Sequence, residues 1–561
     1  MNLLKLFTIS FIILFVMAVN AQYQRTAFIN GKIYTVNEKQ PLAQSVVTEG
    51  NKILFVGSDK EVKKYISADT KIIDLKGKLM LPGFIDSHTH FISGGFYLTG
   101  LDLNPAKSRA EFIQILKNYI KNKNDGRWIT GGNWDHENWD VKELPSKEMI
   151  DPFTKNIPVF IRRYDGHMAL ANSYALKLAG ITKDTPSPEG GLIVKDKETG
   201  EPTGILKDNA MDLVTNIIPD HSDEEYIEAA IAAMNEAKRF GVTSIEDMSY
   251  TTDESFERQL QTYQALEKEN KLTVRISTRM PISTYRKLIN VGIQNNFGDD
   301  KIQLGSIKAY ADGSLGSSTA WFFDHYAQDT TNFGLPNDII KNGNFEKWAL
   351  DADKHKLQIC VHAIGDKAVS TVLDAVEKIR KENPDWDRRF HIEHAQHLRP
   401  GDISRFAKLG VIVSVQPTHL MEDGNWAEKR IGKERLKYMH PYNSFLKAGV
   451  KVAFGTDFPV VTLNPMIGLY MAVTRRTSDG KNPSGLEPQE KISIEDAIKC
   501  YTLNSAYAEF QENKKGSIEP GKLADMVVLD KDILTIDPIK IKDVKVVMTI
   551  FDGKVIYTAK K

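Results

Sequence analysis

The sequence predicts an α/β protein made of a (β/α)8 TIM-type barrel, a β-sandwich domain formed by both termini, and an inserted lid subdomain. Apolar, strand-like segments alternate with helical segments through the middle of the chain, as in parallel α/β barrels. Short β-rich segments gather at both ends. One connection in the middle is far longer than the loops usual in such folds, so it is expected to hold a separate subdomain.

The two ends of the chain supply the predicted sandwich. The β-rich segments are residues 27–34, 46–56 and 71–75 near the start, and 526–529, 544–551 and 555–557 at the end. The residues between them that are typical of hairpin turns are Asn30-Gly31, Glu49-Gly50-Asn51, Lys76-Gly77 and Asp552-Gly553. Strand-rich ends around a long middle predict one composite β-sandwich from residues 22–80 and 512–561.

The middle of the chain, residues 81–511, supplies the barrel. Its eight predicted strands are residues 81–86, 242–247, 274–279, 306–311, 358–363, 390–395, 411–416 and 452–457. Residues 366–380 repeat apolar side chains at helical spacing, with Asp366 as the expected N-cap, and residues 493–508 behave similarly.

About 150 residues separate the first two barrel strands, and we assign them to an inserted subdomain at about 95–235. The insertion leaves the barrel at the carboxyl end of the first strand, where barrel active sites lie, so we expect a lid or a pocket wall. Residues 157–162 are a further strand inside it. Of Trp128, Trp134 and Trp139, we expect two in the core of the insertion and Trp134 in the pocket.

Composition excludes several classes of protein. The 561 residues include 73 Lys plus Arg and 73 Asp plus Glu, which indicates neither a basic surface for nucleic acid nor an acidic tail. Two cysteines are too few for a disulfide framework or a cysteine-rich zinc module. Any bound metal must therefore be held by histidine and carboxylate.

Residues 1–21 have the pattern of a signal peptide. Lys5 supplies the positive charge, residues 6–19 are apolar but short for a membrane span, and Ala21 ends a small-residue cleavage site. An uncleaved N-terminal anchor is the alternative. Cleavage would leave Gln22 first, and the mature chain would be periplasmic or secreted, without a membrane span and with a formal charge of about minus one.

Histidines and one aspartate stand where predicted barrel strands end. His88 and His90 follow the first strand, and alternate residues of an extended chain face the same side, so both imidazoles can bind one ion. His362, His394 and Asp457 end the fifth, sixth and eighth strands. Because barrel geometry brings these ends together, the sequence predicts a metal site there.

Other side chains near these strands carry different expectations. His391 has the opposite parity from His394, so we expect it outside the barrel as a packing or hydrogen-bonding residue, with His355 and His397 in solvent. Lys308 ends the fourth strand, and an ammonium group cannot bind a cation. The residues alone leave open whether Lys308 is a base, reacts with carbon dioxide to give a carbamate ligand, or forms an outward salt bridge.

Longer motifs around these residues resemble the amidohydrolase superfamily, and within it the formamide-deformylase-like branch (YtcJ-type, amidohydrolase family 3). The motifs are LPGFIDSHTH (81–90), GHMA (166–169), DGSLG (312–316), HAIGD (362–366), HIEH (391–394), SVQPTH (414–419), GTD (455–457) and EPGKLAD (519–525). They cover nearly all of the chain after residue 21. One departure is Ser318, where similar proteins often carry an arginine, and it concerns the substrate side of the fourth-strand loop.

The resemblance implies a hydrolase with one or two divalent metal ions. His88, His90 and Asp457 would hold the more buried ion, His362 and His394 would hold the second, and a carbamate on Lys308 would bridge them. Zinc is the expected metal, with manganese or iron as alternatives, because imidazole and carboxylate ligands suit it. The metal would activate a water molecule, and Asp457 would carry the water's proton to the leaving nitrogen.

Substrate contacts are expected from the insertion and from the loops after the fourth and seventh strands. The expected residues are Trp134, His167, Asp312, Gln416 and His419, with a structural role as the alternative for His167. The loop from 312 to 316 is rich in glycine and serine and should line the mouth of the site.

The leading hypothesis is an exported metal-dependent amidohydrolase that cleaves a C–N amide bond of the N-acyl or N-formyl type in a small molecule. The same metal centre acting on esters, lactones or cyclic imides is an alternative, because a fold does not fix a function. A secreted ligand-binding protein without catalysis is another. The sequence leaves the substrate and the oligomeric state open, with a homodimer as one option.

Overall fold

The computed structural model describes residues 24–122, 126–164, 166–248 and 253–560. The predicted signal peptide, residues 1–21, lies outside the described residues. Two compact units make up the chain: unit 1 runs to Gly94 and resumes at Ala233, and unit 2 is Gly95–Ala232. Within the described ranges, no helix combines the length and the apolar character that crossing a membrane requires.

Unit 1 contains a parallel barrel that closes almost completely, which confirms the predicted barrel. Its strands, in sheet order, are β22 (Val452–Phe454), β21 (Ile412–Val415), β20 (His391–His394), β19 (Gln358–Ala363), β18 (Ile302–Tyr310), β16 (Arg275–Pro281), β15 (Val242–Asp247) and β8 (Phe84–Thr89). The short β17 (Phe297–Gly298) pairs antiparallel with β18. Asp86 of β8 accepts hydrogen bonds from Thr456 N and Oγ1 at 2.9 and 2.6 Å, so the chain after β22 is tied to the first strand.

The first barrel strand begins later than the predicted residues 81–86. Leu79–Pro82 form β7, which belongs to another sheet, and β8 starts at Phe84. Gly83 separates the two strands: a Cβ there would lie 2.1 Å from Thr243 Oγ1, so only glycine fits. The apolar run is continuous across this break, so hydrophobicity alone does not reveal it.

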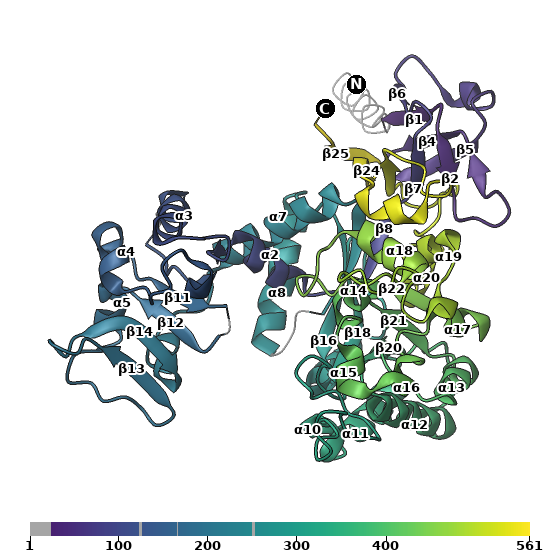
Figure 1. Cartoon of the computed structure of the whole chain (residues 1–561). Helices are drawn as coiled ribbons and strands as arrows, with labels where there is room; N and C mark the ends of the chain where they lie inside the picture. The colour runs from purple at the N-terminus through teal and green to yellow at the C-terminus, as the bar shows by residue number, and fades with distance from the viewer. Residues whose placement is uncertain (1–23, 123–125, 165, 249–252, 561) are drawn as a thin grey trace, which may run out of the picture. The chain divides into compact units, whose positions relative to one another are not determined.

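The helices of unit 1 surround these strands (Figure 1). They are α8 (Asp253–Lys268), α9 (Tyr285–Asn290), α10 (Asp338–Lys341), α11 (Asn344–Lys354), α12 (Asp366–Glu382), α13 (Asp402–Leu409), α14 (Leu420–Asp423), α15 (Ala427–Ile431), α16 (Lys433–Leu436), α17 (Tyr442–Lys447), α18 (Pro465–Thr474), α19 (Ile494–Cys500) and α20 (Leu503–Ala508). The predicted helix at 366–380 is α12, but Gly365 is its N-cap, and Asp366 accepts the N–H of Phe323 at 3.0 Å instead. The predicted helix at 493–508 is two helices, α19 and α20.

The two ends of the chain build two further sheets of unit 1. One has the order β5 (Lys52–Gly57), β4 (Ser45–Glu49), β1 (Arg25–Ile29), β6 (Lys71–Asp74), and the other β25 (Lys554–Thr558), β24 (Val546–Phe551), β23 (Met526–Leu529), β7, β2 (Lys32–Tyr34), β3 (Leu42–Ala43). Figure 1 shows the yellow C-terminal strands beside the purple β2 and β7. Phe28 and Val46 of the first sheet and Met526 and Ile550 of the second belong to one hydrophobic cluster, so side chains from both termini pack together.

Two of the four predicted hairpin turns join a hairpin. Gly50-Asn51 connects antiparallel β4 and β5, and Asp552-Gly553 connects antiparallel β24 and β25. Asn30-Gly31 and Lys76-Gly77 instead carry the chain from one sheet to the other. The local backbone is the left-handed turn that these residues favour, with φ of 53° at Asn30 and 52° at Lys76. A turn sequence thus specifies the bend but not the partner of the next strand.

Unit 2 has its own sheet and core. The sheet order is β13 (Gly191–Lys195), β14 (Pro202–Asp208), β12 (Met168–Ala171), β11 (Phe160–Arg163), β10 (Gly131–Trp134), β9 (Leu101–Asp102), and the helices are α3 (Arg109–Asn122), α4 (Lys147–Thr154), α5 (Ser173–Leu178) and α6 (Asp212–Thr215). α2 (Phe91–Thr99) and α7 (Asp223–Arg239) contain the unit boundaries. The predicted strand at 157–162 is β11, displaced by a few residues.

The prediction that Trp134 lies in a substrate pocket is wrong. Its side chain is completely buried in the core of unit 2, next to Trp139, and its Nε1–H donates to the carbonyl oxygen of Ile161 at 2.9 Å. Trp128 is only partly buried and lines a small cavity of unit 2.

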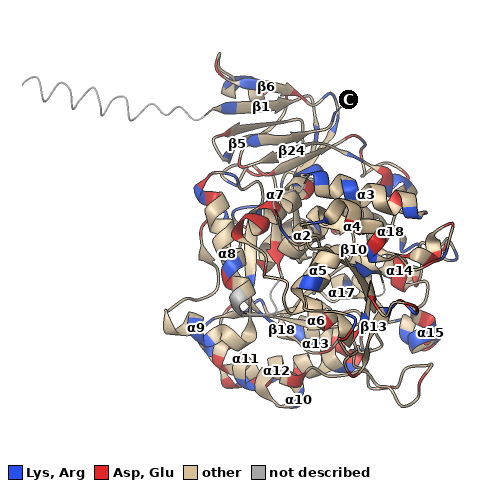
Figure 2. Ribbon diagram, turned by 90° about the vertical axis from the view of Figure 1, so that its left-hand side faces the viewer, with Lys and Arg blue, Asp and Glu red and all other residues tan. Residues whose placement is uncertain are grey.

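Basic and acidic residues are mixed along the helices of the chain. Figure 2 shows blue (Lys, Arg) and red (Asp, Glu) positions interspersed along the ribbons of helices such as α8 and α15.

Candidate metal centre

The carboxyl ends of the barrel strands surround one cavity of about 420 Å³. Its lining residues are His88, His90, Tyr310, Ser314, Leu315, Gly316, His362, Ile364, His394, Gln396, His419, Asp423, Asp457 and Val460. Five of the six predicted metal ligands are among them, and they come from β8 and the residue after it, from β19 and β20, and from the segment after β22. A cavity of this size holds a small molecule.

Three of these side chains are close enough to share one ion. One ligand atom from each of His88, His394 and Asp457 lies within 4.8 Å of the other two, and all three residues are buried. The Nε2 atoms of His88 and His90 lie 3.5 and 3.1 Å from Asp457 Oδ1. His394 and Asp457 both have left-handed backbone, with φ of 69° and 64°. Such strain in a non-glycine residue is typical of functional sites.

His362 lies beside this group. Its ring centroid is 4.5 Å from that of His394. Its Nε2–H donates to the carbonyl oxygen of Gly313 at 3.2 Å, and the same nitrogen is 3.6 Å from Asp312 Oδ1.

The charges of the site suit a cation. Burial, and then the nearby Lys308 ammonium, lower the pKa of His88 below its usual range and that of His362 to about 3. Burial, followed by His362 and His88, lowers the pKa of His394. Burial opposes ionisation of Asp457, but His419, His88 and His90 hold its pKa well below the usual value. Neutral imidazoles and a carboxylate are the forms that bind metal.

Glu393 is a site residue that the sequence did not predict. The Nδ1–H of His88 donates to Glu393 Oε2 at 2.7 Å, and both side chains are buried. A carboxylate in this place fixes the ring and leaves the other nitrogen, Nε2, directed at Asp457. The left-handed backbone of His394 breaks the alternation of β20, so strand parity is not a guide to where its neighbours point.

His391 and Glu393 are neighbours in the same strand. His391 is completely buried, its Nε2 lies 3.2 Å from the carbonyl oxygen of Ala508, and its Nδ1 lies 3.5 Å from Glu393 Oε1. These contacts are those of the packing and hydrogen-bonding residue that was predicted. His355 is exposed, as expected.

The prediction for His397 is wrong, because this residue is buried rather than in solvent. Only 2 % of its surface is exposed, and neither ring nitrogen finds a hydrogen-bond partner among the described residues. Burial and the nearby Arg435 lower the pKa of His397 to about 3.

Lys308 provides a test of whether these residues fit a metal centre. The side chain is 3 % exposed, and its Nζ has no hydrogen-bond partner among the described residues. Its Nζ lies 5.1 Å from the ring centre of Tyr310. A buried ammonium without a carboxylate partner is costly, whereas a carbamate bound to cations would satisfy the same position. The donor set and this unpaired lysine therefore fit a divalent metal centre.

Asp312 holds the loop after β18 rather than lining the cavity. Its carboxylate accepts the N–H groups of Trp321, Ile364 and Gly365 at 2.7, 3.0 and 2.8 Å. Burial raises the pKa of Asp312 to about 7, although these three hydrogen bonds lower it. The cavity is lined instead by the next residues of the loop, from Ser314 to Gly316.

The same loop shows what replaces the arginine expected at position 318. Arg430 of α15 donates to Ser318 Oγ at 2.6 Å and to the carbonyl oxygen of Gly316 at 3.3 Å. A guanidinium from another element thus contacts the loop that lines the cavity.

The remaining predicted substrate residues lie in different surroundings. His419 lines the cavity, with Nε2 3.3 Å from Asp457 Oδ2. Gln416 is buried, and its Nε2 donates to the carbonyl oxygen of Ser414 at 3.2 Å. His167 is an exposed residue of unit 2, with Nδ1 3.0 Å from Asp208 Oδ1.

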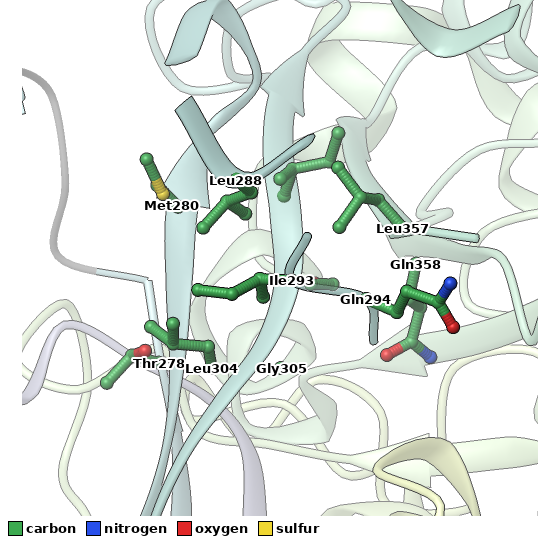
Figure 3. Close-up of a pocket in the computed structure, with 11 residues that line it drawn as sticks. Thr278, Met280, Leu288, Ile293, Gln294, Leu304, Gly305, Leu357 and Gln358 are labelled. Atoms are coloured by element: carbon green, nitrogen blue, oxygen red, sulfur yellow. The ribbon is translucent and has the colours of Figure 1, made fainter. Parts of the chain in front are cut away.

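A second cavity of the barrel does not have these properties. It lies in the wall formed by β16 and β18, is lined by side chains such as Met280, Leu288 and Ile293, and has a volume of about 10 Å³ (Figure 3). That is room for about one water molecule, so this cavity is a packing gap rather than a binding site.

Comparisons with known proteins agree with this geometry. The model of a family described as "Amidohydrolase family" matches residues 71–557. Similar sequences include LONG AFTER FAR-RED 3 of Arabidopsis thaliana, 39% identical over 89% of this chain and 86% of the relative. Putative amidohydrolase YtcJ of Bacillus subtilis is 31% identical over 94% and 98%. N-substituted formamide deformylase of Arthrobacter pascens is 27% identical over 96% and 99%.

A solved structure is similar over almost its whole length. The uncharacterized metal-dependent hydrolase from Pyrococcus horikoshii OT3 has a TM-score of 0.75 and 29% sequence identity, covering 92% of this chain and 99% of the other. The family model spans the strands that carry the histidines, the lysine and the aspartate described above. The resemblance predicted from the motifs is thereby confirmed, and the protein belongs to the amidohydrolase family.

Proposed function

We propose that the protein is a metal-dependent amidohydrolase that cleaves a C–N amide bond of the N-acyl or N-formyl type. The observation that supports this most strongly is the convergence of His88, His394 and the ionised Asp457 at one cavity, with their ligand atoms within 4.8 Å of one another. A relative whose name states that it deformylates N-substituted formamides is similar over 96% of the chain, which supports the choice of bond.

The chemistry assigns distinct tasks to the chain's own residues. A divalent ion held by His88, His90, His394 and Asp457 would supply Lewis acidity and a water molecule of lowered pKa. Asp457 lies between His90 and His419, at 3.1 and 3.3 Å, and is the base that takes the water's proton and the acid that returns it to the leaving nitrogen. His419, across the same carboxylate, is placed to keep Asp457 oriented or to donate to the substrate.

Zinc is the metal we propose, and Lys308 would carry a carbamate that serves as a further ligand. Neutral histidines and a carboxylate are typical zinc ligands. The buried Nζ without a hydrogen-bond partner supports the carbamate, since an ammonium that is buried and unpaired is costly.

The test is a turnover screen of the metal-loaded full chain against N-formyl amines, N-acyl amines, N-acyl amino acids and cyclic amides. We expect amide turnover that disappears with a chelator and returns with zinc. Turnover of esters, lactones or cyclic imides alone would reassign the bond, and tight binding of a ligand without turnover would make the protein a binding protein instead.

We further propose that unit 2 is a lid and that the sheets from both termini act as one sandwich domain. Unit 2 leaves the chain shortly after His90, which supports a role at the site. Amide hydrogen exchange with and without a substrate analogue tests the lid: protection gained in Gly95–Ala232 on binding supports it, and unchanged exchange contradicts it.

Export is a proposal that the sequence of residues 1–21 supports. N-terminal sequencing of the protein from its native host tests it, with Gln22 as the expected first residue and Met1 as the contrary result. We also propose that the mature protein acts on a small molecule without nucleic acid, and that it is a homodimer. Light scattering tests the homodimer: the mass of two chains supports it, and the mass of one chain contradicts it.

A further inference from the structure

The cavity wall outside the metal ligands has a distinctive charge. None of its fourteen lining residues is a lysine or an arginine, and the carboxylate besides Asp457 is Asp423. Much of the remaining wall is apolar, from Tyr310, Leu315, Ile364 and Val460. A substrate that enters this cavity meets a hydrophobic surface and one acidic group.

One carboxylate oxygen of Asp423 accepts a hydrogen bond from the protein, and the other does not accept one from the described residues. It is the last residue of α14, which begins directly after His419. Gln396 Nε2 donates to Asp423 Oδ2 at 2.9 Å, while Oδ1 accepts no hydrogen bond from any of the described residues. Burial raises the pKa of Asp423, and both His419 and the Gln396 hydrogen bond oppose that shift. Because Asp423 lines the cavity, its carboxylate has acceptor capacity that a ligand can use.

We propose that Asp423 selects substrates with a positively charged group, so that the preferred amides are acylated amines carrying a second, free ammonium group. This inference rests on the proposed function and deepens it. A charge-assisted hydrogen bond from an ammonium to Asp423 is stronger than one between neutral groups. A carboxylate in the same place would be repelled by Asp423 and would find no lysine or arginine on the wall.

The apolar part of the wall defines the rest of the substrate. Tyr310, Leu315 and Ile364 suit a chain of methylene groups between the amide and the ammonium. A cavity of about 420 Å³ accommodates an acyl group and a short diamine. The substrate class is thus a monoacylated diamine, and N-acyl amino acids are disfavoured.

Three amides of equal length test the proposal on the zinc-loaded full chain: N-(4-aminobutyl)acetamide, N-pentylacetamide and 5-acetamidopentanoate. We expect the cationic amide to exceed the neutral one in kcat/KM by about tenfold, mostly through KM, and the anionic amide to be poorest. In Asp423→Asn the ratio of cationic to neutral kcat/KM should fall to about one, because the charge that separates the two amides is gone.

Glu422→Gln is the matched control. It removes the same charge from the adjacent position, where the side chain is exposed, accepts from Asn425 Nδ2 at 3.3 Å and is not part of the cavity wall. Its ratio of cationic to neutral turnover should equal that of the wild type. An equal loss in both variants would mean that general charge, not Asp423, sets the preference, and would overturn the proposal.

A binding experiment tests the role of Asp423 independently of the proposed hydrolysis. Calorimetry with pentylammonium and pentan-1-ol on the zinc-loaded chain should show tighter binding of the ammonium, and Asp423→Asn should remove the difference. If no amide is hydrolysed but this difference is found, the proposed function fails and the assignment of Asp423 holds. A wild-type protein that prefers neither the cationic amide nor pentylammonium overturns the assignment, whether or not the variant folds.

Discussion

Asp457 is held from both sides, which suits the two roles proposed for it, metal ligand and proton carrier. Its Oδ1 lies near His90 and its Oδ2 near His419, at 3.1 and 3.3 Å. These partners keep its pKa well below the usual value, so the group is an anion over the neutral range. A proton taken from water during the reaction is then held only transiently.

Replacing Asp457 with Asn keeps the shape but removes the base. We expect turnover to fall by about a hundredfold or more, while the fold and most of the bound metal remain, because the histidine ligands are intact. Steady-state kinetics, metal analysis and circular dichroism check this. Retained turnover would remove Asp457 as the proton carrier.

Lys308 is predicted to carry a carbamate in the metal-loaded protein. Carbon-13 NMR in the presence of labelled carbon dioxide should show a carbamate signal that Lys308→Ala lacks, and that variant should hold fewer metal ions. Added formate or acetate should restore part of its turnover by occupying the vacated position. Metal-loaded protein with no carbamate signal would contradict the proposed carbamate.

His397 makes stability depend on pH without touching the metal ligands. Its pKa in the folded chain is about 3, below the value near 6.5 of an unfolded histidine, so on acidification the unfolded state takes up the proton first. The free energy of unfolding therefore falls as pH decreases from about 6.5 toward 3, by ~2 kcal/mol at pH 5 from this residue.

Urea unfolding of the metal-free protein at pH 7.5 and 5 measures this term. His397→Gln should show a smaller loss between the two pH values than the wild type. Equal losses in both proteins would mean that His397 is protonated in the folded state or takes up its proton without cost.

The sequence predicted residues at strand ends well and residues elsewhere poorly. His88, His394 and Asp457 follow apolar strands, so barrel geometry alone brings them together, as the structure does. Glu393 escaped prediction because the left-handed His394 breaks the strand alternation. Trp134 and His397 were misplaced because the sequence pattern around a single residue does not show whether its side chain faces a core, a cavity or solvent.

At the scale of elements, the sheet built by both termini is joined to the barrel through a buried ion pair. Arg275 of β16 donates to the two oxygens of Asp525, just before β23, at 2.6 and 3.0 Å, and to Asp552 at 3.1 Å. Only 3 % of Arg275 and 4 % of Asp525 are exposed. A planar guanidinium between two carboxylates fixes the orientation of these elements.

Breaking this pair should destabilise unit 1 strongly. Asp525→Asn leaves the buried Arg275 with less charge opposite it, and we expect a loss of about 3 kcal/mol. Asp543→Asn, an exposed aspartate near β24, should change stability by less than about 0.5 kcal/mol. Chemical unfolding of the three proteins compares them, and equal stability of the two variants would contradict a structural role for the pair.

The positions of strands were predicted better than their pairing in the sheets. The strands at 242–247, 358–363 and 526–529 have the predicted bounds, because apolar runs between polar turns define them. The run at 79–89 was split wrongly, since the break at Gly83 depends on the close approach of Thr243 from another strand. Hairpins at Asn30 and Lys76 were assigned wrongly for a similar reason: the pairing is decided by tertiary packing.

At the scale of the whole molecule, the length of the chain reflects an insertion and not a series of domains. Unit 1 joins the residues up to Gly94 to those from Ala233 onward, and unit 2 is a compact unit with its own core. The histidine and carboxylate ligands come from positions as distant as His88 and Asp457, so they form one site only in the folded barrel. Metal binding is therefore expected to stabilise unit 1 as well as to enable catalysis.

The most direct test of the central claim is the metal content of the full chain purified without chelator, measured together with turnover during zinc titration. A metal centre at the strand ends predicts at least about one divalent ion per chain, with turnover that is lost on chelation and rises with bound zinc to a plateau. His394→Ala should lower both the metal content and the plateau. Less than about one ion per chain, with no gain in turnover on adding zinc or manganese, would contradict the account.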